Sequence, residues 1–115
     1  MTADCLFCKI VAGDIPATVV HDGERTFAFR DINPQAPVHV LFIPKDAVAT
    51  LNDLGADHAA LIAKLFLAAT GWAKQQGFAD DGYRLVMNCN KHGGQTVFHI
   101  HLHLLAGRQM HWPPG

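Results

Sequence analysis

The sequence predicts a single α+β domain in which helices cover one face of an antiparallel sheet. Three observations support this fold class: two hairpin-like pairs of short β-prone runs, one long amphipathic helix, and a length of 115 residues, which leaves room for one domain. The sequence contains no evident repeat, low-complexity stretch or linker. Residues 1–115 are therefore expected to form one domain.

The first expected elements are a short helix and a hairpin. A helix is predicted over residues 5–12, with Asp4 as its cap and Gly13 as its end. The runs 18–21 and 26–30 are β-prone and are separated by an Asp-Gly turn. This pattern predicts two antiparallel strands directly after the helix.

The remaining elements are strands and one long helix. The apolar run 39–43 is expected to be a strand, because the two prolines before it favour an extended loop. A helix is predicted over residues 57–76 with Asp57 as its N-cap. The core-facing stripe of this helix comprises Leu61, Leu65, Ala68 and Trp72. Further strands are expected over residues 83–88 and 95–105.

Composition narrows the classes of function. Nine Lys and Arg residues against ten Asp and Glu residues give a net charge of −1, so a broad basic surface for nucleic acid or anionic membrane is not expected. The chain shows neither a secretory signal nor an apolar run as long as a membrane span, which indicates a cytoplasmic protein. Three cysteines in a reducing compartment argue against a disulfide framework.

The eight histidines include a cluster that alternates with apolar residues. In an extended strand, His99, His101 and His103 point to one face, whereas the apolar residues Phe98, Ile100, Leu102 and Leu104 point to the other. A merely solvated face is the alternative, but Thr, Lys or Glu would serve there more simply. Clustered histidines act chiefly as general acids, nucleophiles or metal ligands, and we favour such a role.

The spacing of the three histidines helps to distinguish a catalytic role from metal binding. His99 and His103 would lie about 13 Å apart along the strand, so one ion cannot easily bind all three histidines. Two of them could bind zinc with Cys5 and Cys8, although this CxxC pair lacks a recognisable second half. Nucleophilic attack by the central imidazole on an anionic phosphorus centre would use all three. The preceding Gly-Gly pair offers exposed N–H groups for a phosphate.

The segment 99–105 resembles the His-x-His-x-His-x-x signature of the histidine triad (HIT) superfamily. The resemblance covers nearly the whole chain and points to the Hint branch. It includes Asp31-Ile32-Asn33-Pro34-Gln35-Ala36-Pro37, the strand with His39 that ends at Ile43-Pro44, Tyr83-Arg84 leading to Asn88, Gly93-Gly94-Gln95, and residues 107–115. It implies a HIT fold, with about five antiparallel strands, one long and one short helix, and a sheet extended across a homodimer.

The resemblance also implies an activity and a set of site residues. Hint proteins are purine nucleoside phosphoramidases that release AMP from adenosine 5′-monophosphoramidate or from aminoacyl and lysyl adenylates. His101 would be the nucleophile, His99 and His103 would orient it and contact the phosphate or the leaving group, and His39 would support the triad. The implied nucleotide-binding residues are Asn88, Gly94, Gln95 and Thr96 for the phosphate, together with His101 and His103, Asp31 for the ribose, and Leu6, Phe7, Ile10, Phe29 and Ile32 for the base. From the residues alone, an ordinary core is the favoured interpretation for Leu6, Phe7 and Phe29.

Two departures from the family pattern leave alternatives open. Thr96 stands where Hint proteins usually have Ser, as in the Fhit branch, so a dinucleotide polyphosphate hydrolase is an alternative, as is a nucleotide-binding interaction module. Related bacterial proteins with a CxxC pair bind zinc with a further His, and Ala47 lies in the stretch where this His is expected. We therefore predict no tightly bound metal and no cofactor.

The C-terminal tail, residues 107–115, contains Met110, His111 and Trp112, which is too apolar a sequence for a disordered end. The resemblance implies that the tail, with Trp112, reaches towards the active site of the partner in a homodimer. Docking on its own protomer is the alternative. The expected partners are therefore a purine nucleotide and a second copy of the chain, with no nucleic acid or membrane.

Overall fold

The computed structural model describes residues 5–115, so the expected cap Asp4 lies outside the described residues. The elements are, in chain order, α1 (Leu6–Ala12), β1 (Val19–Asp22), β2 (Thr26–Arg30), β3 (Val38–Pro44), α2 (Ala59–Gln75), β4 (Arg84–Val86), α3 (Asn90–Gly93) and β5 (Leu102–Ala106). Two single-turn 3-10 helices, Leu51–Asp53 and Ala56–His58, precede α2. Within the described range, no helix is both long and apolar enough to cross a membrane.

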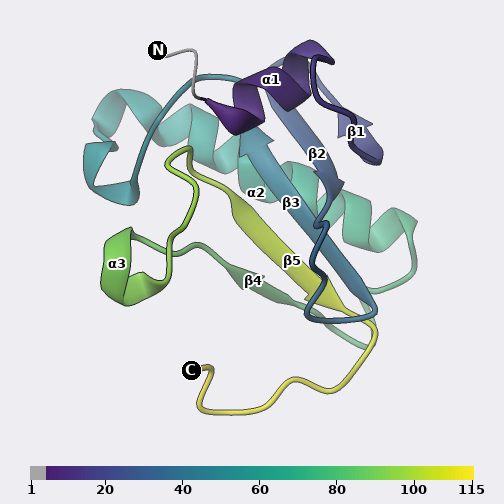
Figure 1. Ribbon diagram of the computed structural model, residues 1–115. Coiled ribbons are helices and arrows are strands. Elements are labelled where there is room, and N and C mark those ends of the chain that lie inside the picture. Colours follow the sequence, from purple (N-terminus) through teal and green to yellow (C-terminus); the bar gives the residue numbers. More distant parts are fainter. Residues whose placement is uncertain (1–4) are drawn as a thin grey trace.

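The five strands form one antiparallel sheet with the order β1-β2-β3-β5-β4 (Figure 1), which confirms the α+β class. The predicted hairpin is present, and the Gly23 N–H donates to the Thr26 carbonyl oxygen across its turn at 2.8 Å. The two strands that carry histidines of interest, β3 and β5, are neighbours near the centre of the sheet. The sheet therefore brings residues about 60 positions apart into contact.

The two faces of the sheet carry separate apolar cores. Alternate residues of the central strands, including Val40, Phe42, Leu102 and Leu104, pack against α2. The other alternate residues, Phe27, Phe29, Leu41 and Ile43, pack against Phe7 and Ile10 of α1. The helices thus lie on opposite faces (Figure 1), and the expectation that both cover one face is wrong. The short helix is amphipathic enough to cover a small core of its own.

The helix ends follow local backbone chemistry. The Cys5 Sγ caps α1 by accepting the Cys8 N–H at 3.1 Å, and Gly13 ends this helix with φ 84°, a conformation that favours glycine. The long helix begins at Ala59 rather than at Asp57, because residues 56–58 form a 3-10 turn with the preceding Gly55 at its N-cap. Three members of the predicted stripe on this helix, Leu61, Leu65 and Trp72, are buried, and Ala68 is only partly buried against the same core. Ala69 and Ala73 are buried as well.

The predicted strand over residues 95–105 is only half correct. Residues 97–99 form a bend, β5 begins at Leu102, and Phe98, expected in the core, is 57% exposed. The buried Gln95 side chain explains the bend, because its amide donates to the Ala49 and Val97 carbonyl oxygens at 2.8 and 3.1 Å. The Ile100 N–H donates to the Val48 carbonyl oxygen at 2.8 Å, so this segment is held by the loop after β3.

Candidate active site

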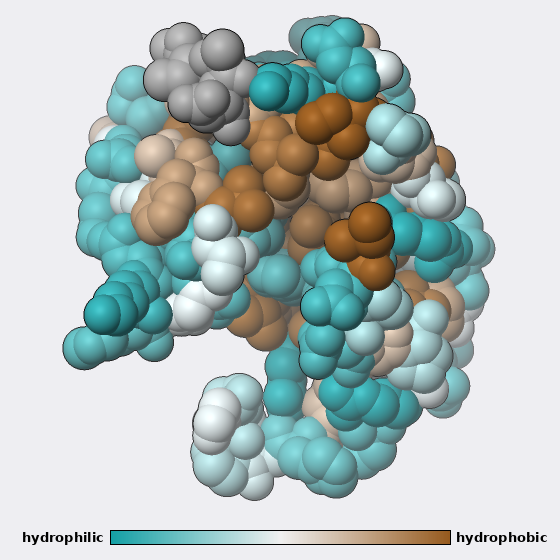
Figure 2. Space-filling view, viewed as in Figure 1, coloured by the Kyte–Doolittle hydropathy of each residue, from teal (hydrophilic) through white to brown (hydrophobic). Residues whose placement is uncertain are grey.

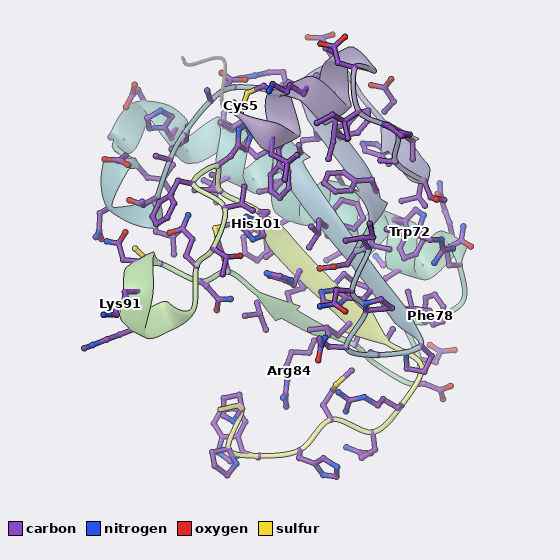
Figure 3. The ribbon with its side chains drawn as sticks, viewed as in Figure 1. Cys5, Trp72, Phe78, Arg84, Lys91 and His101 are labelled. Carbon is purple, nitrogen blue, oxygen red and sulfur yellow. A yellow bond between two sulfur atoms is a disulfide. The ribbon has the colours of Figure 1, made fainter. Side chains whose placement is uncertain are left out.

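The ring of His101 is oriented by the backbone of the bend that precedes β5. Its Nδ1 lies 2.8 Å from the His99 carbonyl oxygen. Because a carbonyl oxygen can only accept, Nδ1 carries the proton, and Nε2 of the neutral ring keeps its lone pair. The Phe7 ring packs edge-on against the imidazole at 5.2 Å between centroids, beneath α1 (Figure 3). His101 is therefore held in the tautomer that a nucleophile needs.

His103 is paired with His39 across β3 and β5. The sheet register places Leu41 opposite His103, so His39 is its diagonal neighbour on the same face, and His39 Nε2 lies 2.9 Å from His103 Nδ1. The Gln35 N–H donates to His39 Nδ1 at 3.0 Å, and Asp31 Oδ2 lies 3.4 Å from His39 Nε2. The second nitrogen of His103, Nε2, is buried and has no hydrogen-bond partner among the described residues.

His99 lies next to the start of α1. Its Nε2–H donates to the Pro44 carbonyl oxygen at 2.8 Å, which leaves the lone pair on Nδ1. Nδ1 lies 3.6 Å from Cys5 Sγ and 3.9 Å from Cys8 Sγ. The Phe7 ring contacts both His99 and His101, at 5.9 and 5.2 Å between centroids, and the His101 and His103 centroids lie 4.9 Å apart. The three rings therefore lie on the α1 side of the sheet, as the alternation predicts, although His99 precedes β5.

Burial keeps the paired histidines neutral. It lowers the pKa of His103 to about 4, and the neighbouring His101 and His39 rings act in the same direction, whereas Asp31 opposes them. Burial also lowers the pKa of His39, again against Asp31, and the pKa of His99, against the Pro44 carbonyl. These rings therefore act through fixed N–H groups and lone pairs near neutral pH.

A cavity of about 690 Å³ opens beside His101 between α1 and the sheet. Figure 2 shows apolar side chains gathered around a hollow on this face of the molecule. Many residues of the predicted nucleotide site line it: Leu6, Phe7, Ile10, Phe29, Asp31, Ile32, Thr96, His101 and His103. Its mixture of apolar walls with a carboxylate, a hydroxyl and two imidazoles suits a ligand with a flat apolar part and a polar part.

Other predicted residues lie outside this cavity lining: His39, Asn88, Gly94, Gln95, His99 and Trp112. The Gln95 amide is occupied by main-chain groups, including the Asn90 N–H, which donates to Oε1 at 2.8 Å. Trp112 is 81% exposed, and its ring centroid lies 5.9 Å from the Arg84 guanidinium carbon. Arg84 also donates to the His111 carbonyl oxygen at 2.9 Å, so the tail curves back beneath β4 (Figure 3).

Sequence reasoning missed part of the cavity wall. The segment 15–18, Arg30, Leu41 and Val97 also line it. The segment 15–18 connects α1 to β1 and carries no motif, so the sequence held no signal for it. The alternation along β3 could have identified Leu41, because His39 and Leu41 share the α1 face.

Comparison with known proteins agrees with this geometry. The HIT domain model matches residues 12–110. The chain belongs to the HIT family. It is 46% identical over 110 residues to the purine nucleoside phosphoramidase of Escherichia coli (strain K12), covering 96% of this chain and 92% of the relative. It is 50% identical over 112 residues to the 14 kDa zinc-binding protein of Zea mays, covering 96% of this chain and 87% of that protein.

A solved HIT structure confirms the fold. The crystal structure of a HIT family hydrolase from Legionella pneumophila Philadelphia 1 superposes with a TM-score of 0.96 at 56% identity, covering 97% of this chain and 100% of that chain. The HIT fold expected from the histidine signature is therefore correct, and the chain is similar to hydrolases of the family.

The HIT relatives raise the question of a zinc site near α1. Cys5, Cys8 and His99 each offer a ligand atom, all within 4.8 Å of one another. However, Cys5 and Cys8 form a disulfide with a Cα–Cα distance of 5.2 Å, which corrects the expectation that the cysteines stay unpaired. Adjacent turns of one short helix bring the two sulfurs together. Three donors, two of them joined in a disulfide, do not fit the four ligands of a structural zinc site. The absence of tight zinc remains a prediction.

Proposed function

We propose that this HIT protein is a purine nucleoside phosphoramidase with His101 as its nucleophile. The observation that carries the proposal is the Nδ1–H···O hydrogen bond from His101 to the His99 carbonyl, because it leaves Nε2 free to attack. The proposed substrates are adenosine 5′-monophosphoramidate and aminoacyl or lysyl adenylates. The similarity to the Escherichia coli enzyme supports this substrate class.

The proposed reaction has two displacement steps. His101 Nε2 attacks the α-phosphorus, the bond from phosphorus to the leaving nitrogen breaks, and the amine departs with a proton taken from water. Water then attacks the nucleotidyl-histidine and gives its proton to the hydroxide left by the first step, the phosphorus–His101 bond breaks, and AMP and the neutral imidazole are released. An adenylate would instead lose its carboxylate at the first step. Negative charge builds up on the phosphoryl oxygens in both transition states, and a nearby N–H donor stabilises this charge.

The residues that line the cavity support a proposed position for each part of the nucleotide. In this proposal, Asp31 accepts hydrogen bonds from the ribose hydroxyls, because a carboxylate can accept two of them. The apolar wall formed by residues of α1 and β2, with Ile32, contacts the base. Ile32 is 99% exposed, which is costly for an apolar side chain unless a ligand or partner covers it. Thr96, with Asn88 and Gly94 nearby in the chain, is assigned to the phosphate.

The reaction class can be tested by trapping the intermediate. Labelled adenosine 5′-monophosphoramidate is mixed with the protein, quenched within milliseconds, and the modified residue is identified by mass spectrometry. Nucleotidyl phosphate is expected on His101, and the His101→Ala variant should lose turnover by more than about 10³-fold. A matched control, His58→Ala at the start of α2, should keep wild-type turnover. Full activity of His101→Ala would exclude His101 as the nucleophile.

The Fhit-like alternative rests on Thr96, which lines the cavity where Hint proteins usually have Ser. Thr96 keeps the hydroxyl group of a serine, but its extra methyl group would crowd the leaving group. Turnover of phosphoramidate and of diadenosine polyphosphate by the same preparation decides between the two enzymes. Tight AMP binding without cleavage of either substrate would instead support a nucleotide-binding module.

We also propose that the protein acts as a cytoplasmic homodimer in which the sheet continues across β4. This strand forms an edge of the sheet, and edges favour pairing unless they are protected. Phe66 and Leu67 on α2 are 40% and 69% exposed, which favours a covered helix face. In this dimer, Trp112 would approach the partner's active site. Analytical ultracentrifugation would detect the dimer, and deletion of residues 110–115 would test the tail through substrate preference.

A further inference from the structure

The root of the C-terminal tail is fitted against the loop that precedes β3. Arg108 donates from Nη2 to the Gln35 carbonyl oxygen at 3.0 Å and from Nη1 to the Gln109 carbonyl oxygen at 3.1 Å. Gly107 adopts φ +94°, and a Cβ atom there would lie only 2.9 Å from Pro37 Cβ. The guanidinium and the close glycine–proline contact therefore join two segments that are about 70 residues apart in the chain.

The loop in turn contacts the active site through the main chain of Gln35. Its N–H donates to His39 Nδ1 at 3.0 Å, while its carbonyl oxygen accepts from Arg108. The Gln35 side chain bends back to the Asn33 carbonyl oxygen at 3.0 Å, and the Asn33 N–H donates to Asp31 Oδ1 at 2.8 Å. The loop thus presents one main-chain N–H to the histidine pair in a defined direction.

This N–H determines where the protons of both histidines lie. A backbone N–H can only donate, so His39 Nδ1 must accept, and neutral His39 carries its proton on Nε2. His39 Nε2–H then donates to His103 Nδ1 at 2.9 Å, so neutral His103 carries its proton on its own Nε2. That N–H is the buried one without a partner among the described residues, on a ring that lines the cavity.

We propose that Arg108 and the main chain of Gln35 are positioning groups that hold His39 and His103 in the tautomers presenting the His103 Nε2–H to an anionic phosphoryl oxygen of the substrate. The inference rests on the proposed function and deepens it. If the protons moved to the other nitrogens, His103 Nε2 would direct a lone pair at the negative oxygen. A donor that stabilises the transition state would then become a source of repulsion.

The role of Arg108 differs from simple tail anchoring. Arg84 also holds the tail, through the His111 carbonyl and the Trp112 ring, but it contacts no group of the histidine pair. Loss of Arg108 frees the Gln35 carbonyl and allows the loop to withdraw its N–H from His39. Loss of a neighbouring tail contact leaves that hydrogen bond intact.

The test combines kinetics with a direct reading of the tautomers. Arg108→Ala, Arg108→Lys and the control Gln109→Ala are compared; the Gln109 amide donates to the Met110 carbonyl oxygen rather than to the loop. Long-range ¹⁵N–¹H spectra of histidine-labelled protein distinguish Nδ1–H from Nε2–H for His39 and His103, without and with AMP. Steady-state kinetics use adenosine 5′-monophosphoramidate, and thermal unfolding shows that each variant is folded.

Wild-type protein should show His39 and His103 as Nε2–H tautomers, and AMP should shift the His103 Nε2–H resonance. Arg108→Ala should populate the other tautomer and lower kcat by about 3- to 10-fold, the loss expected for one hydrogen bond, with a smaller change in KM. Arg108→Lys, which keeps one donor, should recover part of kcat, and Gln109→Ala should match wild type.

Unchanged tautomers and unchanged kcat in Arg108→Ala would overturn the proposal, as would an equal loss in Gln109→Ala. A wild-type protein that cleaves no phosphoramidate would refute the proposed function instead. The tautomers of His39 and His103 and their response to AMP still decide the positioning role in that case. The two failures are therefore distinguishable.

Discussion

His99 and His103 flank His101, the proposed nucleophile, at the same spacing in the sequence, but they lie in different environments. His103 lies on β5, lines the cavity and pairs with His39. His99 lies in the bend before this strand, outside the cavity lining, where its ring contacts the disulfide and its carbonyl orients His101. The difference shows that the environment of each histidine depends on residues far away in the sequence rather than on its position within the motif. In the proposed reaction, His103 acts through its ring and His99 through its main chain.

The first way to break this comparison is to remove the ring of His103. His103→Ala should lower kcat by roughly 10²-fold, because an N–H donor to the phosphoryl oxygens is lost. Its free energy of unfolding should fall by about 1 kcal/mol, less than for a fully unpaired donor, because the His39 Nε2–H loses His103 as its acceptor but keeps Asp31 Oδ2 at 3.4 Å. Steady-state kinetics and urea denaturation measure the two effects. A large loss of stability with unchanged kcat would contradict the assignment.

The matching substitution on the other flank should have the opposite profile. His99→Ala removes a ring that is only 2% exposed and leaves the Pro44 carbonyl without its donor, which should lower the free energy of unfolding by about 2 to 3 kcal/mol. The backbone carbonyl that orients His101 remains, so kcat per folded molecule should fall by less than about 10-fold. If the kcat of His99→Ala fell as far as that of His103→Ala, the two flanks would be equivalent after all.

The sequence predicts the burial pattern around the three histidines, but it does not predict the different environments of His99 and His103. Strand alternation correctly places Leu102 and Leu104 in the core opposite His103, because period-2 burial depends on local chain geometry. The bend at residues 97–99 has no local signal, since it depends on the Gln95 amide reaching Ala49. For the same reason Phe98 is assigned to the wrong environment.

The sequence also predicts only part of which residues meet at the candidate site. The pairing of His39 with His103 requires the order of the strands, which short-range patterns do not specify. Family resemblance suggested both residues, and it also suggested Asp31 and much of the apolar cavity wall. The sequence analysis considered Cys5 and Cys8 as zinc ligands together with two of the histidines, but it could not single out His99, because that contact depends on how α1 packs on the sheet.

A third experiment uses pH to sharpen the contrast between the buried rings and ordinary histidines. The pKa of His103 is about 4 in the folded protein, against about 6.5 when unfolded. Between these values the unfolded chain binds more protons, so stability must decrease as pH falls from 6.5 towards 4. His103 alone should cost about 2 kcal/mol between pH 7 and pH 5.

The lowered pKa values of His39 and His99 act in the same direction. Urea denaturation at pH 7, 6 and 5 measures the slope, and His103→Ala should show a shallower one than wild type. A wild-type stability that stayed constant over this range would show that these rings are not held neutral by burial.

The smallest expected effect concerns metal at the His99 flank. Because the disulfide occupies both sulfurs and Ala47 supplies no ligand, protein purified without chelator should contain well under one equivalent of zinc. Chelator should then change neither its melting temperature nor kcat. Elemental analysis by mass spectrometry provides the measurement. One equivalent of zinc would show that His99 is a ligand in solution and would change the comparison between the flanks.

The placement of the two helices on opposite faces of the sheet has a consequence for how the molecule can vary. The core beneath α2 is large and has no part in the cavity, whereas the core beneath α1 supplies its apolar wall. Substitutions of Phe7, Ile10 or Phe29 would therefore change mainly which ligand binds. Substitutions of Phe42 or Leu65 would change mainly the stability of the fold. During evolution, the α1 face could therefore change its ligand while the core beneath α2 keeps the chain folded.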